Sequence, residues 1–277
     1  MNSLNNGTNS HGRASISQLM NIHPGAVVSQ TARIGTNVVI GPYAIIEDDT
    51  EIGDGCEIRS HAVIKRFTTL GPSNIVYEGA VLGGEPQDIS FVECTSYLRI
   101  GGNNRIREGV TIHRGSHQDS ATIVGSNCFL MANSHIAHNC LLGDRVIIAN
   151  NVALAGYVEI QDQAFISGGV VVHQFTRIGR LAMIGGNAKI VQDCLPFVIT
   201  DGAPGRAHGL NMVGLRRAGL TPNEIRILKD AYRLLLRSGL SLEERLAGLE
   251  QIDDQFVTQL INFVRSSKRG FCHEAKG

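Results

Sequence analysis

Hydrophobic residues recur along most of this chain with a period of six. Steps of six from Ile22 to Ile190 give 29 positions, of which 26 are Ile, Leu or Val. At ordinary usage these residue types would fill about seven such positions by chance. The period fits neither an α-helix, which repeats every 3.6 residues, nor an open strand, which repeats every two. It predicts a parallel β-helix of six-residue repeats, three to a triangular coil.

Glycine often follows the repeating aliphatic residue, as in Ile34-Gly35, Ile40-Gly41 and Leu142-Gly143. We interpret this glycine as a neighbour that can form the turn at each corner of a coil. Such coils bury their aliphatic side chains only by stacking on one another, so stability accumulates along the solenoid. Aromatic residues make up only 5% of the chain, which fits a core of small and branched aliphatics.

The repeat is interrupted in two places. It falters at Asp88 and Cys94, where residues 83–98 contain Pro86 and lack aliphatic–glycine pairs, so we predict a loop that leaves the solenoid. A loop that interrupts so regular a structure is more often functional than decorative. A second break at Gln118 indicates a smaller candidate loop.

The two ends of the chain differ from the repeat. The first nineteen residues are polar and lack the apolar segment of a signal peptide, so we interpret residues 1–20 as a flexible tail. The β-helix is predicted for residues 21–198. Residues 199–277 carry helix signals, namely capping boxes at Thr221 and Ser241 and an apolar face between 254 and 265. We therefore expect an all-β solenoid followed by a C-terminal helical domain.

Charge and cysteine usage narrow the class of protein. Lys and Arg together number 25, as do Asp and Glu, so there is no basic excess of the kind that binds nucleic acid. The six cysteines form no CxxC pair or compact disulfide spacing, which favours free thiols in a reducing compartment. No apolar run approaches the length of a membrane span. We predict a cytoplasmic protein with no membrane span and no nucleic-acid partner.

Two histidines flank an inward aliphatic residue in the segment His135-Ile136-Ala137-His138-Asn139. Because Ile136 faces the core, His135 and His138 are expected on the outside. They could be plain surface residues, or one could be the general base of an acyl transfer whose oxyanion accepts a glycine N–H. A zinc site of the anhydrase type is a third interpretation, which would need His113 or His173 as well; the spacing is not that of a helical HExxH motif.

Several stretches resemble the UDP-N-acetylglucosamine O-acyltransferases of lipid A synthesis: residues 104–115 (NRIREGVTIHRG), 135–156, 172–175 (VHQF), 184–193 and 209–219. The resemblance spans about residues 22–270, although HIAHN also occurs in the related N-acyltransferase of that pathway. It implies a left-handed β-helix and a homotrimer. It also implies transfer of a fatty acyl chain, usually 3-hydroxy, from acyl carrier protein to the 3-position of the UDP sugar. We expect no cofactor or metal, because a histidine can activate the acceptor directly.

The resemblance also implies roles by position. His138 corresponds to the general base, and Gly156 to the backbone donor for the oxyanion. Gln87 and Asp88 would hold the sugar, and Gly186 would limit the acyl chain length. The remaining implied substrate contacts are His135, His173 and Gln174 near the sugar and acyl chain, and Asn211 and Arg217 at the nucleotide.

Four positions depart from the family pattern on the nucleotide-sugar side. Ser90 replaces a lysine, Tyr157 a histidine, Val213 a glutamate and Ala218 an arginine. The acceptor could therefore be a close amino-sugar analogue, and an acyl- or acetyltransferase on another nucleotide sugar stays open. Alternatives of another class are a metal-dependent hydratase and an inactive scaffold.

Basic residues also recur on one face after Thr221. This face is either solvated or a dock for the acidic acyl carrier protein. Its residues are Arg226, Lys229, Arg233 and Arg237.

Overall fold

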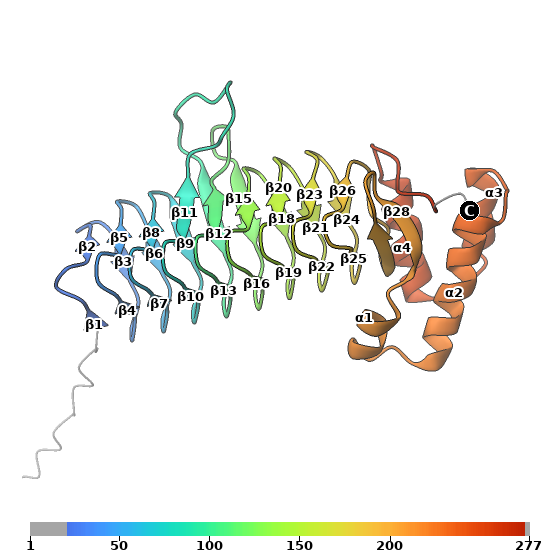
Figure 1. The fold of residues 1–277 in the computed structure, drawn as a ribbon, viewed down its shortest axis with the longest axis horizontal. Helices are drawn as coiled ribbons and strands as arrows, with labels where there is room; N and C mark the ends of the chain where they lie inside the picture. The colour runs from blue at the N-terminus through green and yellow to red at the C-terminus, as the bar shows by residue number, and fades with distance from the viewer. Residues whose placement is uncertain (1–20, 275–277) are drawn as a thin grey trace, which may run out of the picture.

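The computed structural model of the protein describes residues 21–274, so the predicted tail at residues 1–20 lies outside the described part. Residues 21–274 form a left-handed parallel β-helix followed by a smaller helical domain at one end (Figure 1). This confirms the parallel β-helix predicted from the six-residue period, the left-handedness implied by the family resemblance and the C-terminal helical domain predicted from the capping signals.

Each coil contributes one short strand to each of three sheets. The first sheet contains β1 (Asn21–Ile22), β4 (Val39–Ile40), β7 (Glu57–Ile58), β10 (Ile75–Val76), β13 (Arg105–Ile106), β16 (Phe129–Leu130), β19 (Ile147–Ile148), β22 (Phe165–Ile166), β25 (Met183–Ile184), β27 (Val198–Asp201) and β28 (Arg206–Leu210). The second contains β2 (Val27–Val28), β5 (Ile45–Ile46), β8 (Val63–Ile64), β11 (Val81–Gly84), β14 (Thr111–His113), β17 (His135–Ile136), β20 (Ala153–Leu154), β23 (Val171–Val172) and β26 (Lys189–Ile190). The third contains β3 (Arg33–Ile34), β6 (Glu51–Ile52), β9 (Thr68–Leu70), β12 (Tyr97–Ile100), β15 (Ala121–Val124), β18 (Leu141–Leu142), β21 (Glu159–Ile160) and β24 (Arg177–Ile178).

Two columns of inward side chains fill the coils. The repeating aliphatic residues stack in register, as in Ile40 on Ile58, and from Ile40 to Ile190 each is at most 4% exposed. A second column of smaller residues lies two positions earlier in each repeat, for example Val38 and Ala44. Four cysteines occupy this second column and are buried there without a disulfide partner: Cys56, Cys128, Cys140 and Cys194.

The corner turn is made three residues after the aliphatic residue, where φ is positive, as at Asn139 (59°) and Tyr157 (61°). The glycine directly after the aliphatic residue does not make this turn, so the turn role expected for it is wrong. Its lack of a side chain instead allows the next coil to approach. At Gly53, for example, an added Cβ would lie 2.6 Å from the carbonyl carbon of Gly71.

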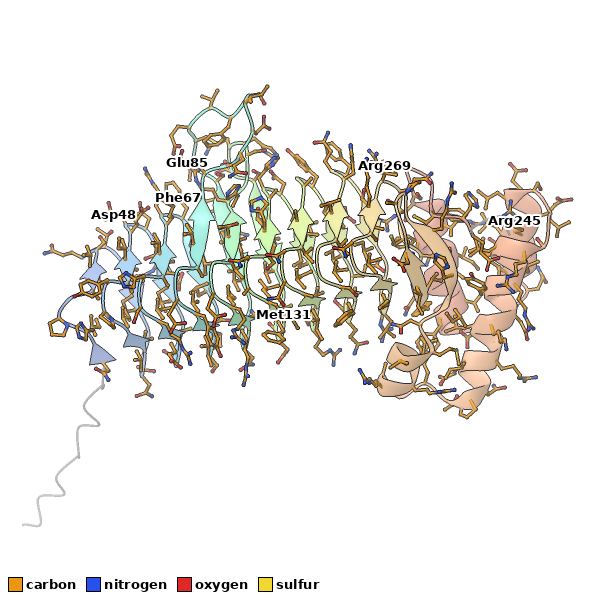
Figure 2. The ribbon with its side chains drawn as sticks, in the orientation of Figure 1. Asp48, Phe67, Glu85, Met131, Arg245 and Arg269 are labelled. Atoms are coloured by element: carbon orange, nitrogen blue, oxygen red, sulfur yellow. The ribbon has the colours of Figure 1, made fainter. Side chains whose placement is uncertain are left out.

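Both interruptions leave the solenoid at the corner between the second and third sheets, in adjacent coils (Figure 1). The larger loop runs from Glu85 to Ser96, because β11 ends at Gly84 and β12 begins at Tyr97, and it is shorter than the predicted 83–98. The loop has 12 residues, twice the repeat, which is why the six-residue phase continues beyond it. Figure 2 shows Glu85 at the start of this loop.

The helical domain closes the C-terminal end of the β-helix. It contains α1 (Met212–Arg217), α2 (Pro222–Arg237), α3 (Leu242–Leu249) and α4 (Gln255–Arg265). The predicted capping boxes at Thr221 and Ser241 are confirmed, and α1 was not predicted. The first sheet continues across the predicted boundary at residue 198, since β27 pairs with β25 and β28 returns antiparallel. No helix in residues 21–274 has the length and apolar character needed to cross a bilayer.

Candidate active site

The sequence His135-Ile136-Ala137-His138 brings one histidine to the outer face of the second sheet and the other to the corner beside it. Ile136 is fully buried in the core, so His135 points outward from β17 and His138 begins the turn. The loop formed by residues 85–96 folds over the same corner. As a result, Oδ2 of Asp88 lies 4.0 Å from Nε2 of His138.

The hydrogen bonds around Asn139 fix the tautomer of His138. Oδ1 of Asn139 accepts hydrogen bonds from the backbone N–H of Ser116 at 3.0 Å and from its hydroxyl at 2.9 Å. Because that backbone N–H can only donate, this atom of Asn139 is an oxygen. Nδ1 of His138 lies 3.0 Å from the same oxygen and is therefore the protonated nitrogen. Nε2 is left with a free lone pair, as a general base requires.

Gly156 packs directly against the imidazole of His138 in the next coil. A Cβ at Gly156 would lie 2.6 Å from Cε1 and 2.7 Å from Nε2 of His138, so only glycine fits. Its backbone N–H forms no hydrogen bond with any residue in the described range 21–274. This N–H is thus available beside the imidazole, where an oxyanion would develop.

A cavity of 560 Å³ lies against this corner and the face of the second sheet. It brings together six of the ten predicted site residues, including both assigned to the chemistry. The other lining residues are small or apolar, as a groove for an acyl chain would require. The predicted residues that line it are Gln87, Asp88, His135, His138, Gly156 and Gln174.

Asp88 is held by the serine that replaces the family lysine. Oδ1 of Asp88 accepts hydrogen bonds from the Ser90 hydroxyl at 2.7 Å and from the Ser90 backbone N–H at 2.9 Å. These bonds, with a smaller contribution from His138, lower the pKa of the Asp88 carboxyl below its usual range. Asp88 therefore stays ionised beside the cavity.

Two further histidines form the wall behind His138. Nδ1 of His135 lies 2.7 Å from Oγ1 of Thr111, and the His113 ring packs edge-on against His135 with centroids 4.7 Å apart. Burial, with the nearby His135 and His138, lowers the pKa of His113 to about 4. Burial also lowers the pKa of His135. Within residues 21–274, no three His, Cys, Asp or Glu side chains are grouped as metal ligands.

Tyr157, at the second departure from the family pattern, forms the other wall. Its ring lies edge-on to His138 at 5.3 Å and stacks on Phe175 at 4.8 Å, while its hydroxyl lies 3.2 Å from that of Ser116. Sequence reasoning did not include Ser116 or Asn139 in the site. The break at Gln118 was the available signal for Ser116, and adjacency to His138 was the signal for Asn139.

Four predicted residues do not line this cavity. His173 is exposed one coil further along, and Gly186 is exposed at the corner between the first and second sheets, where an added Cβ would meet only the Gly168 carbonyl oxygen at 3.6 Å. Arg217 is exposed at the end of α1. Asn211 is buried, with its amide bonded to the Leu181 carbonyl at 2.8 Å and its oxygen capping α1. Asn211 thus has a structural role in this chain.

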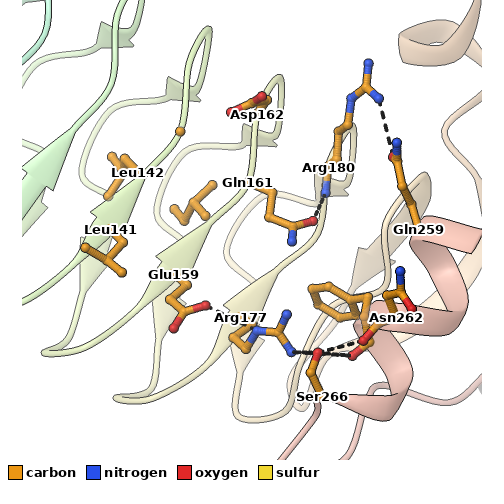
Figure 3. Close-up of a pocket in the computed structure, with 13 residues that line it drawn as sticks. Leu141, Leu142, Glu159, Gln161, Asp162, Arg177, Arg180, Gln259, Asn262 and Ser266 are labelled. Carbon is orange, nitrogen blue, oxygen red and sulfur yellow. Dashed lines mark hydrogen bonds and ion pairs between the residues drawn. The ribbon is translucent and has the colours of Figure 1, made fainter. Parts of the chain in front are cut away.

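A larger cavity of 650 Å³ lies between the third sheet and α4 and contains none of the predicted residues (Figure 3). Its cations are already bonded within it. Arg177 contacts Glu159 at 3.3 Å and the Ser266 hydroxyl at 3.0 Å, and Arg180 donates to Gln259 at 3.3 Å. The predicted site residues that the structure groups together therefore line the cavity at the His138 corner and not this one.

Comparisons with known proteins show which family this chain resembles. Residues 193–272 match the family described as UDP N-acetylglucosamine O-acyltransferase, domain 2, and residues 31–66 and 121–156 match the bacterial transferase hexapeptide family. An acyl-[acyl-carrier-protein]–UDP-N-acetylglucosamine O-acyltransferase from Burkholderia lata is 43% identical over 256 residues, covering 90% of this chain and 98% of the relative. One from Gloeothece citriformis is 44% identical over 206 residues, covering 74% of this chain and 75% of the relative.

Solved structures of similar proteins have the same fold. The UDP-N-acetylglucosamine O-acyltransferase from Moraxella catarrhalis superposes with a TM-score of 0.89 at 41% identity, covering 91% of this chain and 99% of that one. The UDP-N-acetylglucosamine acyltransferase from Bacteroides fragilis superposes with a TM-score of 0.88 at 37% identity, covering 91% and 100%. On the strength of its repeat, its histidine corner and these similarities, the chain belongs to the UDP-N-acetylglucosamine O-acyltransferase family.

Proposed function

We propose that this protein transfers a 3-hydroxy fatty acyl chain from acyl carrier protein to the 3-position of UDP-N-acetylglucosamine or a close amino-sugar analogue, as the first step of lipid A biosynthesis. The observation that carries the proposal is the position of Nε2 of His138, which carries the lone pair in the neutral ring, at the cavity that Asp88 and Gly156 also line. The names of the similar enzymes, which give the donor and the UDP sugar, support the choice of substrates.

The chemistry follows from the positions of these groups. Nε2 of His138 takes the proton of the acceptor hydroxyl or amine as that atom attacks the thioester carbonyl carbon. The carbonyl oxygen becomes an oxyanion, which accepts the Gly156 N–H. Collapse of the tetrahedral intermediate breaks the carbon–sulfur bond, and the departing thiolate recovers the proton from His138. Nδ1 stays bonded to Asn139 throughout and keeps the ring in orientation.

The loop and the wall of histidines prepare the site for the sugar. Ionised Asp88 offers a charged acceptor to sugar hydroxyls, which bind more strongly to a carboxylate than to a neutral group. His113 is buried with a low pKa, so near neutral pH it adds no positive charge beside the base. Gln87 and Gln174 supply further polar side chains to the lining of the same cavity.

A homotrimer would complete the site. The second sheet presents apolar side chains outward, and Val27 and Val171 are 63% and 47% exposed. The outward positions of the first sheet include Phe129, Phe165 and Met183. In a trimer the second sheet of one subunit would pack on the first sheet of its neighbour and form an acyl groove between them. His173, Gly186 and Arg217 would then belong to sites shared between subunits.

The donor and the compartment fit the same proposal. Arg226, Lys229 and Arg233 are exposed on α2 and would attract an acidic carrier protein, mainly by raising its association rate. On the same face, Arg237 is paired with Glu274, and Arg233 forms an exposed ion pair with Asp230 at 3.4 Å. We place the protein in the cytoplasm, where free thiols such as its six cysteines persist.

Mass spectrometry of the products tests the proposal. The protein is incubated with carrier proteins loaded with acyl chains of graded length, together with UDP-N-acetylglucosamine or its 3-amino analogue. A single added acyl chain on the sugar is the expected product, as an ester on the first acceptor or an amide on the second. No product from any pair would contradict the proposal, and product only with acetyl-coenzyme A would favour the acetyltransferase alternative.

A further inference from the structure

The loop of residues 85–96 carries Gln87 and Asp88 to the cavity, yet its tip has little packing of its own. None of the side chains from Gln87 to Glu93 is buried, and Val92 is 77% exposed. Within the tip, Asp88 is bonded to Ser90 and accepts the Phe91 N–H through its carbonyl oxygen at 2.9 Å. These local bonds shape the tip but do not attach it to the β-helix.

One side chain attaches it. Among the residues from 21 to 274, every hydrogen bond that leaves residues 85–94 ends on the guanidinium of Arg114. Nη2 of Arg114 donates to both carboxylate oxygens of Glu93 at 2.8 Å each, a bidentate pair. Nη1 donates to the Cys94 carbonyl oxygen at 2.6 Å and to the Ser96 hydroxyl at 2.8 Å.

Arg114 is itself held firmly. Its side chain is only 1% exposed, and its backbone N–H donates to the Gly84 carbonyl oxygen at 2.9 Å, where the loop begins. The rings of Phe67 and Phe91 lie 5.8 and 5.3 Å from its guanidinium carbon. A buried cation is costly unless it is paired and fully bonded. Arg114 therefore joins the start of the loop to its end, and the tip with Asp88 lies between the two.

We propose that Arg114 and Glu93 form a clasp that positions Asp88 over His138 and thereby sets the affinity for the acceptor sugar. Neither residue lines the cavity, so both are positioning residues that act through Asp88. The inference rests on the proposed function, in which Asp88 holds the sugar.

Glu93→Ala breaks the clasp from its exposed side, because the Glu93 side chain is 56% exposed. Thermal melting verifies that the variant still folds when buried Arg114 has lost its carboxylate partner. We expect KM for the acceptor sugar to rise about 10- to 100-fold, the cost of a misplaced contact, while KM for the acyl carrier protein stays unchanged. The matched control is Glu108→Ala, which breaks another 2.8 Å Arg–Glu pair in the same coil, away from the loop. The control should change neither constant by more than about two-fold.

A double mutant tells whether the clasp acts through Asp88. In an Asp88→Ala background, Glu93→Ala should have almost no further effect on the acceptor KM, because the group it positions is gone. Effects that multiply instead would overturn the inference. An Asp88→Ala variant with wild-type KM would contradict the sugar contact in the proposed function, and the clasp itself is then judged by the proteolysis below.

Limited proteolysis tests the clasp without an activity assay. Chymotrypsin should cleave after Phe91 about ten times faster in Glu93→Ala than in the wild type, because the released tip opens more often. Glu108→Ala should be cleaved at the wild-type rate. Equal cleavage of all three proteins would overturn the clasp, whatever the kinetic results.

Discussion

Two hollows of nearly equal size lie on the outer face of the second sheet, beside the same corner of the solenoid. One, of 560 Å³, contains His138; the other, of 530 Å³, lies in the N-terminal coils between β2, β5 and the residues that follow them. The repeat places Asp48 where the first hollow has His138, and Arg66 where it has Gly156, in each case two residues after the inward aliphatic residue.

The chemistry of the two hollows is opposite. In the N-terminal hollow, Glu47 is bonded by Lys65 at 3.1 Å and by the Arg66 backbone N–H at 3.1 Å, and Asp48 accepts the Ser29 hydroxyl. The polar groups there satisfy one another, and no loop covers them. At His138 the base keeps a free nitrogen, and a 12-residue loop brings a carboxylate to it. In the proposed mechanism the solenoid supplies the hollow, and a histidine, a glycine and a loop supply the activity.

Removal of the proposed base, His138, should lower activity more than any other single substitution and should separate the two hollows most clearly. We expect His138→Ala to lower kcat by about 10² to 10⁴, the usual contribution of a general base. The melting temperature should change little, because His138 is not a residue of the aliphatic columns. The matched control is Asp48→Ala in the other hollow. Steady-state kinetics that gave His138→Ala the wild-type kcat would remove this residue from the mechanism.

Substitution of Gly156, beside the proposed base, should have the second-largest effect on activity. In Gly156→Ala the new Cβ would collide with the imidazole at 2.6 Å, so the ring must move away from the acceptor. We expect kcat/KM to fall about 10- to 100-fold, as displacement of a catalytic group by about an ångström would cause. Arg66→Ala, at the same position of the other hollow, should be neutral. Full activity in Gly156→Ala would mean that close packing against His138 is not required.

Gly186→Met should change which acyl chain is accepted. Gly186 is exposed, and an added Cβ would approach only one atom, at 3.6 Å, so the variant should fold. A methionine side chain in a groove between subunits would shorten the accepted chain by several methylenes, each worth about 0.8 kcal/mol or roughly four-fold in rate. Rates are compared across carrier proteins with graded acyl lengths. An equal loss at every length would make Gly186 a structural residue only.

Removal of metal ions should have the smallest effect. Because His138 activates the acceptor directly, exhaustive chelation should leave kcat unchanged within about two-fold. The measurement compares chelated and untreated enzyme in the product assay. Activity that disappears on chelation and returns with zinc would support the hydratase alternative.

The sequence predicted the regular parts of the molecule well, because they depend on short-range periodicity. The inward column from Ile40 to Ile190 and the capping boxes at Thr221 and Ser241 follow from local patterns. Contacts between coils were harder to foresee. The bond from Ser116 to Asn139 joins residues 23 apart, a separation set by the smaller inserted loop, between β14 and β15, as well as by the repeat.

Two polar residues show why the contacts of individual side chains could not be predicted from the sequence. Arg114 lies beside the histidine of β14 in sequence, but nothing local indicates that a 12-residue loop will fold back and bury it. The side-chain nitrogen of Asn211 donates to the Leu181 carbonyl oxygen and its side-chain oxygen caps α1, which the sequence did not indicate. In both cases the partner comes from a distant segment whose position depends on the completed fold.

Deletion of residues 85–96 tests most directly whether the loop turns a generic hollow into an active site. Removal of these 12 residues joins Gly84 to Tyr97 and leaves Leu82 and Ile100 six positions apart, so the repeat is restored and the solenoid should fold. Circular dichroism would verify the fold, and mass spectrometry would measure acyl transfer to the UDP sugar. We predict a folded protein whose product formation falls to the level of His138→Ala. A folded deletion variant that transfers the acyl chain at the wild-type rate would contradict the account.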